Sequence, residues 1–174
     1  MAINHTSTPF IDRLLPAPVD GGFQVEDAWV WCGSVIRSDD GRYHMFASMW
    51  KKSVPFTPNW LTNSRVVRAE SATPEGPYAY VEDILPPRGA AYWDGQMSHN
   101  PTVTRCEDTY LLFYTGSTYD GARPNASRPV SDALRFEARR NQRIGLAVAD
   151  APSGPWRRPD RPCLDVRPGG WDSF

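Results

Sequence analysis

The sequence has 174 residues, with 19 Lys and Arg against 20 Asp and Glu, so its formal net charge is −1. This near-neutral balance gives no electrostatic reason to expect a nucleic acid or an anionic membrane as partner. No apolar run approaches the ~20 residues that a membrane-spanning helix needs. Seventeen Pro, 13 Gly and seven each of Trp, Tyr and Phe point to short strands separated by turns. The composition therefore predicts an all-β chain of one ordinary domain.

The cysteines and the N-terminus bear on the cellular compartment. Cys32, Cys106 and Cys163 show neither CxxC spacing nor the His/Cys spacing of a metal site, so we expect reduced thiols and no metal ligand. The first residues lack a basic region followed by an apolar one, which is the pattern of a secretory signal. We therefore expect a cytoplasmic protein.

The sequence repeats itself, and this repeat predicts the fold. Residues 64–80 align with 142–158 at an offset of 78, and residues 29–46 align with 96–113 at an offset of 67. The second offset also places Asp27 on Asp94. Pairs that keep the first offset are Arg65 with Arg143, Gly76 with Gly154, Trp93 with Trp171, and Asp94 with Asp172. The difference of 11 residues predicts an insertion in the second copy, within 119–141.

Each copy reads as four short strands. They are expected at 30–36, 43–49, 65–70 and 78–81 in the first copy, and at 102–106, 110–115, 143–149 and 156–157 in the second. The second strand of the first copy is apolar on both faces, which is typical of a sheet packed between like sheets. A four-stranded antiparallel repeat of this kind is a blade of a β-propeller.

We therefore expect one incomplete propeller domain. Residues 1–24 form an N-terminal segment, 25–92 blade one, 93–170 blade two and 171–174 the start of blade three. Two blades leave apolar faces uncovered, so we expect a truncated piece of a longer propeller; a complete two-sheet β-sandwich is the alternative. Within the insertion, the sequence of 131–140 predicts a short helix or a turn, with Ser131 as the N-cap of the helix.

The residues that enter strand one of each blade are where chemistry is expected, because innermost strands line the central funnel of a propeller. Carboxylates, an imidazole, an amide and indoles gather there: Glu26, Asp27 and Trp31 in blade one, and Trp93, Asp94, His99 and Asn100 in blade two. Aromatic rings stack on the C–H faces of a sugar, while carboxylates and amides hold its hydroxyls. This composition predicts a carbohydrate site.

Several segments resemble the five-bladed propeller glycoside hydrolases, the superfamily of the family-43 arabinanases and xylosidases with families 32 and 117 as relatives. The segments are 40–46, 92–95, 99–102, 142–147 and 154–156. The resemblance covers about two of five blades, so it concerns an N-terminal portion. It implies a glycoside hydrolase that acts on an oligosaccharide by acid/base catalysis, with carboxylates at the funnel and no cofactor.

The resemblance also implies roles for individual residues. Asp27 would be base or nucleophile, Asp94 would tune a pKa or hold the substrate, and His99 would bind substrate or donate a proton. Further substrate-binding candidates are Glu26, Trp31, Trp93, Asn100 and Asp172. The expected partner is a carbohydrate, and a general acid would come from a later blade.

The sequence departs from the family pattern at the position that carries an acidic residue directly before Pro. Asn100 fills it in blade two and Gly33 in blade one, with Asp94 and Asp27 six residues upstream. This departure favours a second hypothesis, a non-catalytic glycan-binding or scaffolding propeller.

Structural interpretations stand beside the functional ones. Asp94 and Asp172 each follow a Trp at matching repeat positions, as structural turn residues would. His99 could equally be a hydrogen-bonded core histidine, and Asn100 could cap a strand. Trp50 and Trp60 bracket a loop, and either blade packing or stacking on a sugar accounts for them. The recurring Arg65 and Arg143 predict ion pairs between blades.

Overall fold

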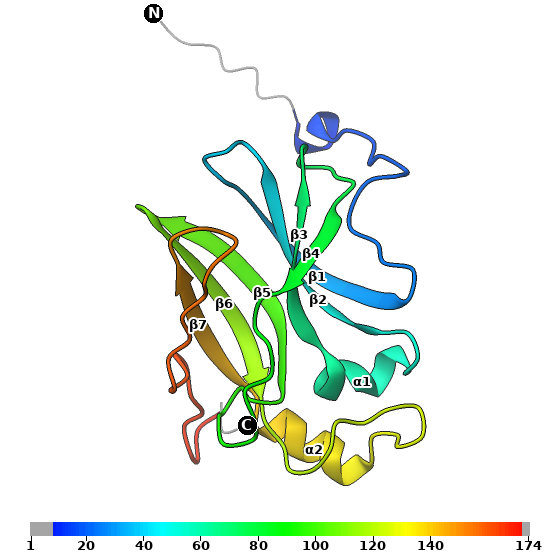
Figure 1. The fold of residues 1–174 in the computed structure, drawn as a ribbon, viewed down its shortest axis with the longest axis vertical. Coiled ribbons are helices and arrows are strands. Elements are labelled where there is room, and N and C mark those ends of the chain that lie inside the picture. Colours follow the sequence, from blue (N-terminus) through cyan, green and yellow to red (C-terminus); the bar gives the residue numbers. More distant parts are fainter. Residues whose placement is uncertain (1–8, 172–174) are drawn as a thin grey trace, which may run out of the picture.

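The computed structural model describes residues 9–171, which form two antiparallel sheets packed against each other (Figure 1). The first sheet has the order β1-β2-β3-β4, with β1 (Ala28–Arg37), β2 (Tyr43–Lys51), β3 (Arg65–Ser71) and β4 (Ala79–Asp83). The second has the order β5-β6-β7, with β5 (Met97–Cys106), β6 (Thr109–Ser117) and β7 (Arg143–Ala149). The helical elements are η1 (Phe10–Arg13), α1 (Phe56–Asn63) and α2 (Asp132–Arg140). None of the helices in the described part of the chain has the length and apolarity that crossing a bilayer requires.

Seven of the eight predicted strands are confirmed, and the eighth is not formed. Where the fourth strand of blade two was expected, a single bridge joins Val148 to Arg157. Pro155 and Pro159 flank this position, and proline has no N–H to donate to a ladder. The second sheet therefore has three strands in the described residues.

The helix expected at 131–140 is confirmed as α2, and the hydroxyl oxygen of Ser131 accepts a hydrogen bond from the Leu134 amide at 3.2 Å. The helix α1 was not predicted, because Pro55 and Pro58 at its start read as a loop.

The two sheets share one apolar core. Its buried members come from both blades: Phe46, Val66, Ile84, Leu85, Val103, Leu112, Tyr114 and Ala147. Polar bonds also cross the junction, because the hydroxyl of Ser48 accepts from the Asn100 amide at 2.9 Å and that of Ser34 accepts from the Val103 amide at 3.1 Å. The strand β5 thus lies beside β1 and β2, as neighbouring innermost strands of a propeller do.

Each innermost strand carries the same irregularity, and it corrects the sequence alignment. The pairing register shifts between Trp31 and Ser34 in β1 and between His99 and Thr102 in β5. Inside these bulges, Cys32 has φ 55° and Asn100 has φ 49°. Cys32 is therefore equivalent to Asn100, so the predicted match of Gly33 with Asn100 is wrong by one residue.

The physical reason is a hairpin turn that is one residue shorter in blade two. Arg37 pairs with Tyr43 across the first turn, whereas Arg105 pairs with Tyr110 across the second. In both hairpins the guanidinium lies over the paired ring, at 5.8 Å and 5.3 Å from its centroid.

The predicted ion pairs between blades are wrong as well. The Nε of Arg65 donates to Asp83 Oδ1 at 2.8 Å, and Arg143 pairs with Asp165. Asp83 ends the fourth strand of the same sheet and Asp165 follows β7, so each arginine pairs within its own blade.

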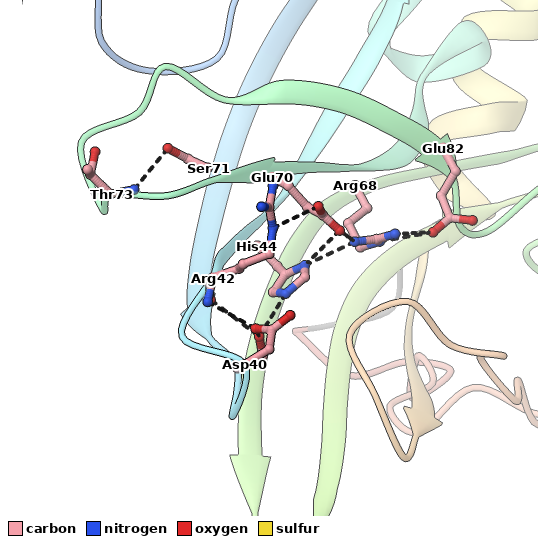
Figure 2. A network of polar contacts seen from close by, with 9 residues as sticks. Asp40, Arg42, His44, Arg68, Glu70, Ser71, Thr73 and Glu82 are labelled. Atoms are coloured by element: carbon pink, nitrogen blue, oxygen red, sulfur yellow. Dashed lines mark hydrogen bonds and ion pairs between the residues drawn. The ribbon is translucent and has the colours of Figure 1, made fainter.

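A polar network holds the outer strands of blade one together near the hairpin end (Figure 2). The buried Arg68 donates to Glu82 Oε1 through Nε at 2.9 Å and Nη2 at 2.6 Å, and it also pairs with Glu70. The His44 ring bridges Ser38 Oγ at 2.9 Å and Arg68 Nη1 at 3.0 Å. Burial, followed by the charge of Arg68, lowers the pKa of His44. Cations and carboxylates alternate in this network, and we interpret it as a structural feature that holds the strands of this sheet together.

Candidate functional site

The two innermost strands begin at the same end of the molecule. Ala28, which opens β1, pairs with Lys51 at the end of β2, and Met97, which opens β5, pairs with Ser117 at the end of β6. The helix α1 follows β2, and the insertion that carries α2 follows β6. The two helices touch and lie together at this end (Figure 1). The leading ends of both blades therefore gather as the propeller prediction requires.

An aromatic platform, which we define as Trp31, Phe56, Trp60 and His99, lies at this end. The Trp60 ring stacks on the His99 ring at 5.3 Å between centroids, with the planes 12° apart. Trp31 meets Trp60 edge-on at 6.1 Å and Phe56 at 5.5 Å. Trp31 remains 42% exposed. The platform thus combines rings from both blades and offers an open aromatic surface.

Trp50 and Trp60, for which blade packing and stacking on a sugar were both considered, are placed differently. Trp50 is 1% exposed and packs against Phe56, which is blade packing. Trp60 is only partly buried and lies on the platform. Nothing in the spacing of Trp60 and His99 along the sequence signalled this contact.

His99 is the buried member of the platform. Its side chain is among the buried polar groups at 2% exposure, and burial lowers its pKa to about 4. Its Nε2 lies 3.3 Å from Nε2 of Gln142, whereas its Nδ1 has no hydrogen-bond partner among the described residues. With the Gln142 amide in this orientation, Nε2 of the ring accepts and Nδ1 carries the proton. At neutral pH the ring is uncharged, which suits a binding role better than proton donation.

Glu26 and Asp27 occupy a tight turn directly before β1. The amide of Ala28 donates to the carbonyl of Val25 at 3.2 Å, and the carbonyl of Asp27 accepts from the Lys52 amide at 2.8 Å. Both acidic residues are exposed. The turn therefore presents two carboxylates at the same end as the platform.

Asp94 is placed differently, because its carboxylate is fully buried in an ion-pair cluster. Its Oδ1 accepts from Arg88 Nε at 2.7 Å, and its Oδ2 accepts from the Tyr114 hydroxyl at 2.8 Å and from Arg158 Nη1 at 3.3 Å. Burial, together with this carboxylate, raises the pKa of Tyr114. These contacts favour the structural interpretation of Asp94, and its catalytic role stays a prediction.

Trp93 lies in the same junction. Its ring stacks on Tyr114 with centroids 5.7 Å apart. Gly116 and Gly145 leave room for it, because a Cβ at either position would come within 2.7 Å of the indole. Trp93 and Asp94 are therefore packed against β6 and β7. Trp31 and His99 instead belong to the platform, and Glu26 and Asp27 lie in the turn before β1.

The remaining candidates lie on the strand bulges or beyond the described part. Asn100 is exposed and Cys32 is half-buried at the equivalent bulge position. Asp172 lies outside the described residues. Across residues 9–171, no group of three or more His, Cys, Asp or Glu side chains is arranged to hold a metal ion.

The sequence matches no protein-family model, and no curated protein is significantly similar to it. Solved structures do match. A family 117 glycoside hydrolase produced by the marine bacterium Zobellia galactanivorans has 15% identity and a TM-score of 0.65, over 88% of this chain and 46% of that one. A GH43_1 enzyme from Xanthomonas citri complexed with xylotriose has 17% identity and a TM-score of 0.52, over 79% and 34%.

A GH43 beta-xylosidase/alpha-arabinofuranosidase from a compost microbial metagenome, in complex with xylotriose, has 16% identity and a TM-score of 0.53, over 79% of this chain and 36% of that one. The chain thus spans between a third and a half of the length of these enzymes. Its two sheets have the fold of part of a five-bladed propeller glycoside hydrolase, and the resemblance seen in the sequence is confirmed at the level of fold.

Proposed function

We propose that the chain is part of a glycoside hydrolase and that its aromatic platform binds a sugar ring of an oligosaccharide substrate. The observation that carries this proposal is the Trp60–His99 stack beside the exposed Trp31, at the end where both innermost strands begin. An indole face attracts the C–H face of a sugar, and a neighbouring polar group then fixes its orientation. Asn100 and Glu26 supply polar groups at this end.

In this proposal Asp27 acts as base or nucleophile. Its position in an exposed turn before β1 leaves the carboxylate accessible to a ligand. Glycoside hydrolysis needs a second carboxyl group on the other side of the scissile bond. Since the chain spans 34–46% of its structural neighbours, we assign that general acid to a blade outside this chain.

The second candidate function is a non-catalytic glycan-binding propeller. It is favoured by Cys32 and Asn100, because these occupy the equivalent bulge positions of the innermost strands and neither side chain is a carboxylate. Binding through the platform is common to both candidates, and turnover distinguishes them.

The test uses the complete protein that contains this chain, assayed on aryl glycosides as a function of pH. Asp27→Asn is expected to lower kcat at least about 100-fold, since it removes the base. Asp108→Asn is the matched control, because Asp108 is an exposed aspartate in the β5–β6 turn at the opposite end. Turnover that survives Asp27→Asn overturns the assignment of Asp27. Sugar binding without any turnover overturns the hydrolase and supports the binding module.

Sugar binding is tested separately by calorimetry. Trp60→Ala is expected to weaken binding about tenfold, through loss of a stacking surface. Phe10→Ala, which removes an exposed ring in η1, is the control that leaves binding unchanged. Equal affinities of Trp60→Ala and the wild type would overturn the platform as the binding surface.

A further inference from the structure

A basic pocket of about 260 Å³ lies where the ends of β2 and α1 and the start of β3 face the insertion of blade two. It is lined from blade one by Lys51, Asn63 and Arg65, and from the insertion of blade two by Arg123 and Asn125; Ser53, Val54 and Pro124 complete it. Three of these side chains are cationic and none is a carboxylate. The pocket therefore lies between the blades and carries an excess of positive charge.

The polar groups of this pocket are held in place by hydrogen bonds. Arg123 Nη2 donates to the Gln96 carbonyl at 2.7 Å, and Asn63 Nδ2 donates to the Pro124 carbonyl at 2.7 Å. Arg65 is fixed through its Nε by Asp83. The pocket has three cationic side chains, and Asp83 neutralises one of them, so the pocket keeps a net charge of two positive units. Donors that are fixed before binding lose little conformational freedom when an anion arrives.

Short stretches of both blades connect the pocket to the platform. Asn63 follows Trp60 by three residues in α1, and residues at this spacing are neighbours on one helix face. Gln96, which holds Arg123, precedes His99 by three residues where β5 begins. A saccharide that extends from the platform along these short stretches would reach the basic pocket.

We propose that this pocket binds an anionic substituent of the saccharide, either the carboxylate of a uronic acid or a sulfate ester. This inference rests on the proposed function, because it takes the ligand of the platform to be a saccharide. It narrows the substrate class to acidic oligosaccharides. Fixed guanidinium groups suit both oxyanions, since each offers two oxygens to paired N–H donors.

The experiment compares three oligosaccharides of equal length by calorimetry: neutral, uronate-containing and sulfated. We expect at least one acidic oligomer to bind about tenfold more tightly than the neutral one, with an advantage that shrinks as salt is added. The double variant Lys51→Met with Arg65→Met is expected to lose this preference while keeping its affinity for the neutral oligomer. Which acidic oligomer shows the preference identifies the source of the oxyanion.

Two controls keep the inference falsifiable. Arg161→Met removes an exposed cation after β7 and is expected to change nothing. If the double variant unfolds at a lower temperature than the wild type, Lys51→Met alone replaces it in the binding comparison, because Lys51 is exposed. Equal affinity of the wild type for neutral and acidic oligomers overturns the anionic pocket and leaves the proposed function standing.

A separate probe distinguishes failure of the proposed function from failure of the anion pocket. Inorganic sulfate is titrated while the Nε–Hε signals of Arg65 and Arg123 are followed by NMR. Shifts that disappear with Lys51→Met support an anion pocket. If no oligosaccharide binds in the same samples, the proposed function is overturned while the pocket stands; if sulfate shifts neither signal and acidic oligomers show no preference, the pocket is overturned.

Discussion

The imidazole of His99 and the indole of Trp60 lie face to face, with centroids 5.3 Å apart and planes inclined by 12°. His99 belongs to β5 of blade two, and Trp60 to α1 of blade one. The stack therefore crosses the blade junction, and the platform exists only when both blades are in place.

We expect His99 to titrate near pH 4, because burial disfavours its charged form. Its folded-state pKa lies below the ordinary 6.5, so the unfolded chain binds the proton more tightly. The contribution to stability is then full above about pH 6.5 and is lost as the pH falls towards 4, by up to about 3 kcal/mol. Urea unfolding at pH 7 and pH 5 checks this: the wild type should lose about 2 kcal/mol more than His99→Gln. Equal losses would show that His99 is not shifted.

We expect Asp94→Asn to lower the free energy of unfolding by about 3 kcal/mol, because Arg88 and Arg158 lose a buried carboxylate. Asp160→Asn removes an exposed partner of the same Arg88 and should cost less than about 1 kcal/mol. Chemical denaturation of both variants measures the difference. An Asp94→Asn protein with wild-type stability and no glycosidase activity would instead restore the catalytic role.

We expect Gly145→Ala to be strongly destabilising. A Cβ there would lie 2.5 Å from Cη2 of Trp93 and 2.6 Å from Cζ of Tyr114, and neither ring has room to retreat from a packed junction. The expected cost is about 2–3 kcal/mol. Gly33→Ala is the control, since its new Cβ would meet the Met45 sulfur at 3.1 Å, in a side chain that is flexible. Thermal unfolding compares the two, and a smaller loss for Gly145→Ala than for Gly33→Ala would contradict this packing of Trp93.

Most of the fold could be predicted because strand periodicity and turn residues are local signals. The strands of blade one and the hairpin of blade two follow from short apolar and aromatic runs between turn residues, and these runs recur along the chain; Ser131 marked the start of α2. The equivalence of Cys32 with Asn100 was missed, because the turn between Arg105 and Tyr110 is one residue shorter than the turn between Arg37 and Tyr43, and an alignment at a constant offset does not allow for this.

The candidate site could be predicted only in part. His99 and Trp31, two of the candidates expected near the start of strand one, come together on the platform because the propeller geometry gathers the innermost strands. Trp60 reaches the site through α1, which begins among prolines that suggested a loop. Asp94 shared its place in the repeat with Asp27, and its ion pairs were not foreseen. Arg88 lies only six residues before it, but Arg158 comes from a stretch 64 residues further along the chain.

The insertion of blade two is tied to blade one at two points. The Tyr119 hydroxyl donates to the Thr62 carbonyl at 2.9 Å, and Asn63 donates to the Pro124 carbonyl. Four residues separate those two anchor points in the insertion, so lengthening this short span would move Arg123 relative to Trp60. Under the proposed binding of an acidic saccharide, loop length here sets the spacing between the ring-stacking surface and the basic pocket, and variants with added residues should favour longer ligands over shorter ones.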